Sequence, residues 1–437
     1  MEVSYIIERL CDCGYHAYIT GGAVRDALAG LPSKDEDIVT NATPEEIEKV
    51  FLGHDVKFVG KQFLVTLVDG VEVATYRKDT YGGFSDKNCE VSFVETLGED
   101  LGRRDITINS LAYCEYTGEV IDLYGGQDDL KKKIIKFVNN PKERIHEDPN
   151  RIIRACRFLA KIDGRFECKT FEALCEYSHY VRDYVAKERI RLEILKALEL
   201  PKPSLFFQAL FEINALQYIF PSMIPCADHH HGKHHREDIF THLMIVGDSI
   251  SPKYPLLRLS GYLHDVGKPE SYSDDGKFIN HENVGAEIII KELQDLRFSI
   301  DEVSKVSNLI KCHMYSIKDI SPKSIRKLLV FLNELGLNYS EFLRLRIADR
   351  IGNLAKPNFT LKEIKEVLLK FKNVINEKTP FSVKSLMING DDVMNLLNLV
   401  PGKKVGEILK MLFEYVLENG PEYNTREKLL EQLREMG

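Results

Sequence analysis

Apolar and polar residues alternate in short segments over the first 125 residues, a pattern that is typical of strands. The segment Tyr18–Thr20 is short and mostly apolar, and residues 63–68 and 71–76 lie on either side of Asp69-Gly70. Because an Asp-Gly pair suits a type I′ turn, the two longer segments are predicted to form a β-hairpin. The N-terminal part of the chain is therefore predicted to contain a sheet.

Helical spacing of apolar residues accompanies these strands and replaces them after about residue 126. Helices are predicted over Tyr5–Cys13 and Ala23–Leu28, and a third begins after Thr43, because Pro44-Glu-Glu follows this capping residue. Residues 188–198 have apolar side chains at helical intervals, and this spacing continues almost to the C-terminus. An α/β part followed by an all-helical part is therefore expected.

Composition indicates a folded protein of several domains. The chain has 437 residues, of which 44% are hydrophobic and 29% charged, and no apolar run approaches the roughly 20 residues of a membrane helix. The first residues lack a secretion signal, and the nine cysteines follow no repeating frame, so reduced thiols and a cytoplasmic location are expected. The Cys11-x-Cys13 pair has no second pair to complete a zinc site, and ordinary packing explains it.

Charge is unevenly distributed along the chain. The net charge is −8, yet nine Lys or Arg face three acids between Lys131 and Arg157. A local basic patch of this kind can attract a phosphate backbone whatever the total charge, although charge alone favours a solvated helix face.

Two aspartates two residues apart provide the first candidate for chemistry. If the segment 34–39 is a strand, Asp35 and Asp37 point from the same face, and a bridging cation offsets their repulsion. Glu72, on the second strand of the predicted hairpin, is placed to add a third carboxylate. Hard oxygen ligands suit Mg²⁺, and two such ions about 4 Å apart activate a 3′ hydroxyl and stabilise leaving pyrophosphate.

A glycine pair precedes these carboxylates. Gly21 and Gly22 lie between a predicted strand and a predicted helix, and Arg25 follows them. Glycine allows a phosphate to approach the exposed amides at a helix N-terminus. Each of these signals is common by chance when taken separately.

Five segments in order resemble the class II polymerase-β-like nucleotidyltransferases, the family of CCA-adding enzymes and bacterial poly(A) polymerases. Residues 21–47, GGAVRDALAGLPSKDEDIVTNATPEEI, resemble the family's first motif, and residues 103–109 resemble R-R-D-x-x-x-N. Residues 122–128 are similar to the neck-joining motif and residues 147–151 to E-D-x-x-R. Residues 188–193 resemble the helical motif that braces this last segment. Together the five segments span roughly residues 20–200.

The resemblance implies roles for individual residues. Asp35, Asp37 and Glu72 would be catalytic, and the sugar and phosphates of the incoming nucleotide would lie near the R-R-D-x-x-x-N segment. Asp148 and Arg151 would act as the template, because Asp148 accepts from the exocyclic amine of C or A and Arg151 donates to a ring acceptor. The residues expected to bind nucleotide are Gly21, Gly22, Arg25, Arg104, Asp105, Asn109, Asp148, Arg151, Arg154 and Arg157. Without the resemblance, Asp148 and Pro149 would be interpreted as a helix N-cap followed by solvated arginines.

Two features depart from the family pattern. Residues 77–93 correspond to a flexible loop in which an Arg commonly follows an Asp, whereas Asp86 is followed here by Lys87-Asn88. Glu36 replaces the usual residue between the two aspartates. An enzyme that adds only CC, or only the terminal A, is therefore an alternative to one that adds all three nucleotides.

A second group of metal-ligating residues follows in the helical part. His242, His264-Asp265 and Asp349 are expected to converge on one divalent ion, and the imidazoles favour a transition metal. This order resembles the HD phosphohydrolase superfamily, which implies metal binding and attack of activated water on a phosphate ester. His281 and His313 lie where some HD proteins have ligands for an additional metal.

Two neighbouring features have competing interpretations. Lys268 follows the His-Asp pair closely and suits a substrate phosphate. The His-rich segment 229–235 is interpreted as a polar exposed loop. The HD-type domain itself is either a phosphohydrolase, acting on 2′,3′-cyclic phosphates, 2′-nucleotides or other phosphoesters, or a metal-binding remnant without turnover.

The expected fold class is α+β, a polymerase-β-like nucleotidyltransferase head with an antiparallel or mixed sheet, followed by helical domains. The predicted domains are a head (1–125), a helical neck (126–225), an HD-type domain (226–355) and a helical tail that binds tRNA (356–437). The expected function is addition of CCA to tRNA from CTP and ATP with Mg²⁺. The alternatives are a poly(A) polymerase, a metallophosphohydrolase that only binds RNA through its head, and an RNA-binding module without activity.

Overall fold

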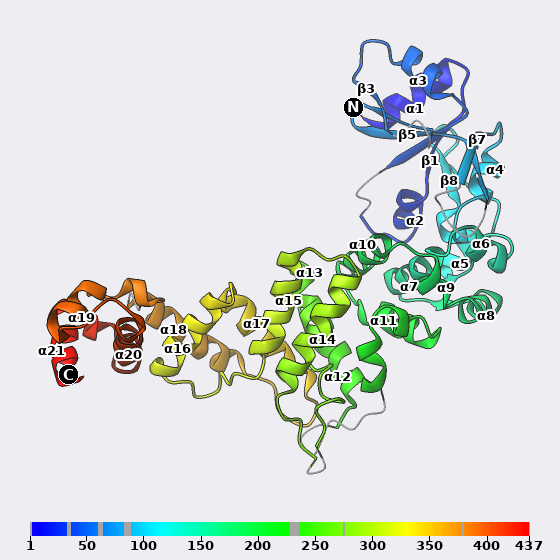
Figure 1. Ribbon diagram of the computed structural model, residues 1–437. Coiled ribbons are helices and arrows are strands. Elements are labelled where there is room, and N and C mark those ends of the chain that lie inside the picture. Colours follow the sequence, from blue (N-terminus) through cyan, green and yellow to red (C-terminus); the bar gives the residue numbers. More distant parts are fainter. Residues whose placement is uncertain are drawn as a thin grey trace. The chain divides into compact units, whose positions relative to one another are not determined.

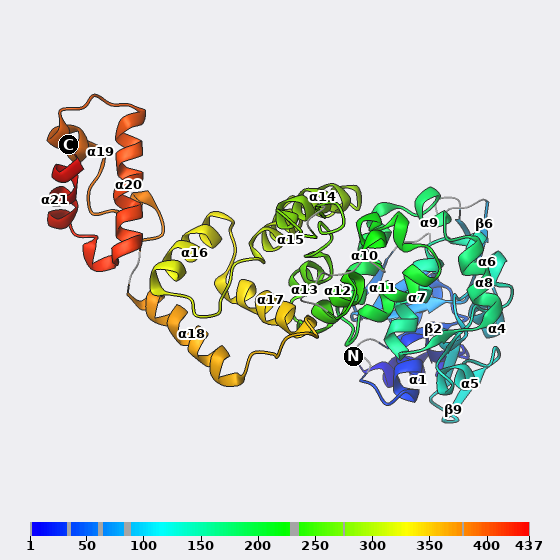
Figure 2. The same cartoon turned by 90° about the horizontal axis from the view of Figure 1, so that it is seen from below.

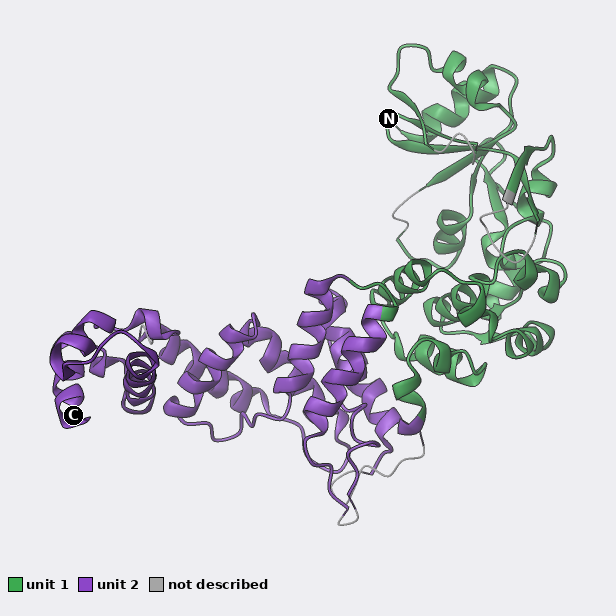
Figure 3. Ribbon diagram, viewed as in Figure 1, with its two compact units in different colours: residues 1–224, 295–298 green, residues 225–294, 299–437 purple. Residues whose placement is uncertain are grey.

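The computed structural model describes residues 2–32, 36–59, 64–82, 89–227, 236–273, 276–377 and 380–436. The chain divides into two compact units (Figure 3), unit 1 with residues 1–224 and 295–298, and unit 2 with residues 225–294 and 299–437. The finer boundaries of neck, HD-type domain and tail stay predictions. Among the described helices, none combines the length and the apolar character that a membrane crossing needs.

Unit 1 begins with a seven-stranded mixed sheet, as predicted. Its strands, in spatial order, are β3 (Val56–Phe58), β4 (Val65–Val68), β5 (Val71–Thr75), β2 (Asp37–Thr40), β1 (Ala17–Thr20), β8 (Leu111–Cys114) and β9 (Glu119–Asp122). β2 and β5 run parallel, and the other neighbouring strands run antiparallel. The parallel pair joins the β3–β4–β5 meander to the rest of the sheet (Figure 1).

The predicted hairpin is confirmed as β4 and β5. Asp69 and Gly70 have φ angles of 48° and 88°, and positive φ at both positions is what a type I′ turn requires. The predicted strand over residues 34–39 is shorter than expected, because β2 begins at Asp37. Asp35 lies outside the described residues.

The helices of the head pack on this sheet or flank it. α1 (Val3–Asp12) and α3 (Pro44–Val50) enclose a core with β2 and β5, in which Ile6, Ile38 and Val73 are fully buried. Thr43 caps α3 through a reciprocal capping box with Glu46, as its sequence predicts. The remaining head elements are α2 (Gly22–Leu28), α4 (Leu97–Gly102) and the separate hairpin of β6 (Arg77–Tyr81) and β7 (Cys89–Phe93).

Helices dominate the rest of unit 1. They are α5 (Gly126–Lys131), α6 (Pro141–Glu147), α7 (Arg151–Ile162), α8 (Cys168–Glu176), α9 (Tyr180–Asp183), α10 (Lys187–Leu198) and α11 (Ser204–Glu212). α7 packs between α10 and α11, and nine of its twelve residues are buried. A short parallel pair of strands, β10 (Ile134–Ile135) and β11 (Arg165–Phe166), also lies in this part of the chain, where no strand was predicted.

Unit 2 is helical throughout its described residues. Its helices are α12 (Ile239–Asp248), α13 (Pro255–Leu263), α14 (His281–Asp295), α15 (Ile300–Cys312), α16 (Pro322–Glu334), α17 (Tyr339–Gly352), α18 (Leu361–Asn376), α19 (Gly390–Leu397), α20 (Lys403–Asn419) and α21 (Arg426–Met436). One buried core joins α12, α13 and α15 to α18, and a second joins α19, α20 and α21 (Figure 2).

Candidate functional site

A cavity of about 930 Å³ in unit 1 brings together the residues predicted to bind nucleotide. All ten of those residues line it: Gly21, Gly22, Arg25, Arg104, Asp105, Asn109, Asp148, Arg151, Arg154 and Arg157. Asp37 and Glu72 line the same cavity. Positions that are up to 136 residues apart in the sequence thus face one space.

The two described carboxylates come from neighbouring parallel strands. Ile38 of β2 is in register with Val73 of β5, so Asp37 and Glu72 each precede a paired residue by one position. Side chains at equal register on parallel strands project from the same face, and both carboxylates border the cavity. Asp37 is half-buried and Glu72 exposed. Hard oxygen donors open to a cavity fit Mg²⁺, which keeps positions for water and phosphate.

The glycine turn requires Gly21. This residue has φ 70° and ψ −123° as the N-cap of α2, and its N–H donates to Leu111 O over 3.1 Å. A Cβ atom at this position would lie 3.0 Å from Nη1 of Arg104. Arg25, which is 4% exposed, donates to Oδ1 of Asn109, so the turn and the R-R-D-x-x-x-N segment are tied together.

Asp105 connects that segment to α7. Its Oδ2 accepts from Nε and Nη2 of Arg154 over 2.8 and 2.6 Å, and its Oδ1 accepts from Nδ2 of Asn109 over 3.1 Å. Burial alone would raise the pKa of Asp105, but the charge of Arg154 and these hydrogen bonds outweigh it and lower the pKa. Arg157 pairs with Glu193 of α10. Arg154 and Arg157 of α7 are therefore held by carboxylates at the cavity wall.

Asp148 follows the last turn of α6, and Asn150 is the N-cap of α7. Arg151 and Arg157 are buried, so the arginines are not solvated as the helix-cap interpretation expects. A cap nevertheless has support from Asp148, whose Oδ1 accepts from the N–H of Asn150 over 3.1 Å. Its two carboxylate oxygens accept from Nη1 and Nη2 of Arg189 over 2.9 and 2.8 Å. Arg189 was not among the predicted site residues, although it belongs to the 188–193 segment whose resemblance implies a bracing role.

Arg151 is equally constrained. One of its terminal nitrogens donates to Glu147 Oε2 over 2.6 Å and to Arg144 O over 3.0 Å. The other donates to Arg103 O over 2.9 Å. The candidate base-reading pair therefore sits in a framework that fixes both side chains before any nucleotide binds.

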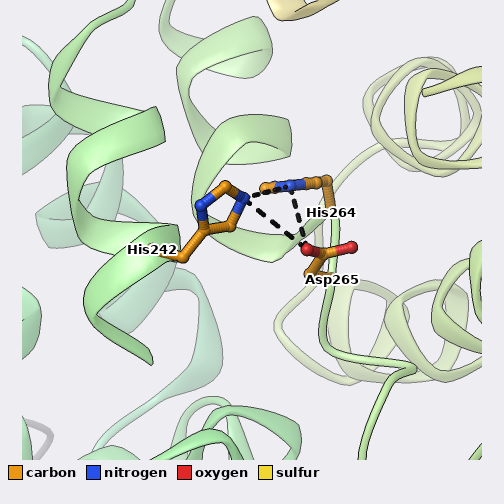
Figure 4. Close-up of side chains that lie close together, drawn as sticks. All are labelled: His242, His264 and Asp265. Carbon is orange, nitrogen blue, oxygen red and sulfur yellow. Dashed lines mark hydrogen bonds and ion pairs between the residues drawn. The ribbon is translucent and has the colours of Figure 1, made fainter. Parts of the chain in front are cut away.

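The predicted metal ligands of unit 2 converge as well. Nε2 of His242 lies 3.2 Å from Nε2 of His264 and 3.2 Å from Oδ1 of Asp349. Oδ2 of Asp265 lies 3.6 and 3.4 Å from the same two imidazole nitrogens, as Figure 4 shows. Two imidazoles and two carboxylates around one point form a ligand set that suits a divalent transition metal.

A second set shares Asp265 with the first. Its Oδ1 lies 3.3 Å from Nε2 of His281 and 3.3 Å from Nε2 of His313, and these two nitrogens are 3.2 Å apart. The two oxygens of Asp265 thus face different groups of ligands. This geometry fits the additional metal that the sequence suggested.

Backbone carbonyls orient three of these imidazoles. Nδ1 of His264, His281 and His313 donates to Gly261 O, Phe278 O and Ile310 O over 2.9, 3.0 and 2.6 Å, which directs Nε2 at the cluster and makes it the metal-binding nitrogen whenever the imidazole is neutral. Burial lowers the pKa of His313 to about 4. For His264, burial is outweighed by the charges of Asp265 and Asp349, which raise its pKa to about 9, so a proton and a metal ion compete for this ligand.

Lys268 contacts a ligand of this centre. Its Nζ lies 2.5 Å from Oδ2 of Asp265, and its side chain is largely buried. The predicted contact with a substrate phosphate stays a prediction. The His-rich segment 229–235 and the loop residues Asp86, Lys87 and Asn88 lie outside the described residues.

Comparison with protein families identifies three domains. Residues 17–136 match the Poly A polymerase head domain, residues 165–226 match the probable RNA and SrmB-binding site of polymerase A, and residues 233–333 match the HD domain. The chain therefore joins a poly(A) polymerase head and its RNA-binding segment to an HD domain.

Curated relatives carry two names. The CCA-adding enzymes of Ligilactobacillus salivarius and Enterococcus faecalis are 40% identical over 217 residues and 43% identical over 200 residues. These alignments cover 49% and 45% of this chain, and 53% and 48% of the relatives. Poly(A) polymerase I of Salmonella typhi is 35% identical over 232 residues, 50% of this chain and 49% of the relative. The chain thus spans about half the length of the curated relatives it matches.

Solved structures show the same fold over the whole chain. A structure of the Bacillus stearothermophilus CCA-adding enzyme in complex with CTP matches with a TM-score of 0.70 and 22% identity, over 100% of this chain and 98% of that one. The Thermotoga maritima CCA-adding enzyme complexed with tRNA matches with a TM-score of 0.54 and 19% identity, over 99% and 94%. The chain has the fold of the CCA-adding enzymes.

Proposed function

We propose that this chain, which joins a poly(A) polymerase head and its RNA-binding segment to an HD domain, is a tRNA nucleotidyltransferase. It would add C, C and A to the 3′ end of tRNA from CTP and ATP and release pyrophosphate. The observation that carries the proposal is the single cavity lined by Asp37, Glu72, Asp148 and Arg151, because phosphoryl-transfer carboxylates and a base-reading pair face the same space.

Each group in the cavity has a role in this reaction. Asp37 and Glu72, with Asp35, would hold Mg²⁺, which supplies positive charge at the triphosphate and activates the 3′ hydroxyl. The backbone at Gly21 and Gly22, with Arg25, Arg104 and Asn109, would bind the sugar and phosphates. Asp105 and Arg154 complete this group of residues. Their ion pair ties the R-R-D-x-x-x-N segment to α7, the helix that begins at Arg151.

Selection of the base would depend on Asp148 and Arg151. Cytosine and adenine each present an exocyclic amine beside a ring acceptor. The Asp148 carboxylate would accept from the amine, and the Arg151 guanidinium would donate to the ring acceptor. Uracil and guanine instead present a carbonyl oxygen to the carboxylate and a ring N–H to the guanidinium, so both contacts become repulsive and the wrong base is penalised. Arg189 supports this proposal, since it fixes the Asp148 carboxylate with two hydrogen bonds.

Nucleotide addition tests the proposal directly. The purified protein with Mg²⁺ is incubated with tRNA ending at the discriminator base and with tRNA ending in CC, and CTP and ATP are offered separately and together. Addition of C, C and A followed by a stop is expected. A long A tail on any RNA would favour the poly(A) polymerase alternative. Addition of CC alone would indicate a CC-adding enzyme, and addition of A alone an enzyme that adds only the terminal A.

A second activity is proposed for the HD domain. The two ligand sets that share Asp265 would hold divalent transition metals and activate water for attack on a phosphoester. The protein loaded with Mn²⁺, Ni²⁺ or Co²⁺ is offered 2′,3′-cyclic nucleotides, 2′-nucleotides and a general phosphoester, with His264→Ala as the control. Opening of the cyclic phosphate to a monophosphate, or release of phosphate from the monoesters, by the native chain and not by His264→Ala supports the phosphohydrolase, and bound metal without turnover supports the remnant.

A further inference from the structure

A buried carboxylate in α4 holds two arginines of the nucleotide cavity. Asp100 is fully buried, and its Oδ1 accepts from Nε of Arg103 over 3.0 Å and lies 2.9 Å from Nη2 of the same guanidinium. Its Oδ2 accepts from Nη2 of Arg104 over 3.2 Å. One carboxylate therefore gives one oxygen to each arginine.

Both arginines also face other parts of the site. Nη1 of Arg103 lies 3.2 Å from Oδ2 of Asp79, on the β6–β7 hairpin. Nη1 of Arg104 lies beside Gly21, 3.0 Å from the position that a Cβ would occupy. The two side chains are 16% and 18% exposed, and both line the cavity. Asp100 thus stands behind a cationic wall that extends from the hairpin to the glycine turn.

The charges of this wall leave it positive. The guanidinium groups of Arg77, Arg103 and Arg104 face the carboxylates of Asp79 and Asp100, so three positive charges meet two negative ones. Burial alone would raise the pKa of Asp100, but Arg104 and Arg103 outweigh it and lower the pKa, so the carboxylate stays ionised at neutral pH. A fixed positive surface is suited to the triphosphate of a nucleotide.

We propose that Asp100 is a positioning residue for nucleotide binding, which orients Arg103 and Arg104 toward the sugar and triphosphate of CTP and ATP alike. The inference rests on the proposed function of the cavity. Asp100 holds the side chains of the two arginines, whereas Arg151 of the base-reading pair bonds to the backbone carbonyl of Arg103. Loss of the Asp100 carboxylate should therefore weaken binding of both nucleotides equally and leave base selection intact.

The test is Asp100→Asn in the full chain, with calorimetric titration of CTP and of ATP in the presence of Mg²⁺. The amide keeps the size of the side chain but turns two N–H donors toward one arginine, so the Kd of both nucleotides should rise about tenfold. The ratio of the two Kd values and the preference for CTP over UTP in the addition assay should not change. The matched control is Glu99→Gln, a neighbouring exposed carboxylate that contacts only the capping residue Thr96.

Two further variants separate positioning from folding. Asp79→Asn weakens the contacts of the hairpin carboxylate to Arg103 and Arg77 and should raise the Kd by about threefold, since Asp100 still holds the Arg103 guanidinium. In an Arg104→Gln background, Asp100→Asn should have a smaller effect than in the native chain, because it acts in part through that arginine.

The outcomes distinguish the inference from the proposed function. If the native chain binds neither CTP nor ATP, the proposed function fails. If the native chain binds both and Asp100→Asn binds them with unchanged Kd, or changes the CTP to ATP ratio, only the positioning role is overturned. A lower melting temperature with unchanged Kd for the folded fraction would likewise overturn it, because that result indicates a purely structural carboxylate.

Discussion

Single carboxylates hold the arginines that surround the nucleotide cavity. Asp105 holds Arg154, Asp148 is held by Arg189, and Glu193 holds Arg157. Each pair joins segments that are 36 to 49 residues apart, so the wall of the cavity depends on charges that come together only in the folded chain. Burying such groups is favourable only while both partners are present.

The pair of Asp105 and Arg154 predicts a dependence of stability on pH. The pKa of Asp105 is lower in the folded chain than in the unfolded one, so its contribution is complete above the unfolded pKa of about 4 and is lost as the pH falls toward the folded pKa. Asp105→Asn should lower the free energy of unfolding by about 2 kcal/mol between pH 5 and 8. The difference in the free energy of unfolding between Asp105→Asn and the native chain should become smaller below about pH 4.

Urea unfolding followed by circular dichroism measures this difference. Asp128→Asn is the control, because that carboxylate is 77% exposed and its weak pair with Lys132 should contribute little. An equal loss of stability at pH 7 and at pH 3.5 would contradict the ion pair as the cause.

At the scale of elements, α2 is bounded by two glycines with positive φ that have different surroundings. Gly21 has φ 70° and lies against Arg104, whereas Gly30 has φ 68° and nothing within 4 Å of its Cβ position. Alanine at either position should cost about 1 to 2 kcal/mol of stability, because L side chains disfavour this conformation. Only Gly21→Ala should also weaken CTP binding, since its methyl group meets the guanidinium. Calorimetric titration beside urea unfolding measures both effects, and equal CTP affinity in the two variants would show that the close approach has no role.

Local sequence patterns predicted the elements that depend on local contacts. The turn at Asp69-Gly70 and the N-cap at Thr43 require only neighbouring residues, and both are confirmed. The pairing of β10 with β11 was missed, because two-residue strands joined across about 30 residues have no periodicity to detect.

The site residues were predicted from family motifs rather than from the spacing of apolar residues. This basis explains which site residues were predicted and which were missed. Ordered segments indicated ten residues that were expected to bind nucleotide, and all ten line the cavity. They did not indicate Asp100, although Arg103 and Arg104 follow it at the i+3 and i+4 positions, a spacing that is visible in the sequence. They did not indicate the contact of Arg189 with Asp148 either, because these residues lie 41 positions apart and leave no such spacing. Such partners emerge only when the chain is folded.

For the whole molecule, the two candidate sites belong to separate compact units. Asp37 lies in unit 1 with the nucleotide cavity, and His264 lies in unit 2 with the HD ligands. Each site is assembled from residues of its own unit, so the loss of a ligand in one should leave the ligands of the other in place. Asp37→Ala should therefore reduce nucleotide addition by about a thousandfold or more while the metal content of the HD centre is retained.

His264→Ala should have the opposite effect. The HD centre loses an imidazole that faces three other ligands, so its affinity for Mn²⁺ or Co²⁺ should fall by at least about a hundredfold, while nucleotide addition with Mg²⁺ continues at the native rate. Metal analysis after loading and gel filtration, together with the tRNA extension assay, measures both quantities on the same preparations. If tRNA extension depends on His264, or if the HD metal is lost in Asp37→Ala, the two centres are coupled. Their activities would then not be independent, although each site is built from residues of one unit.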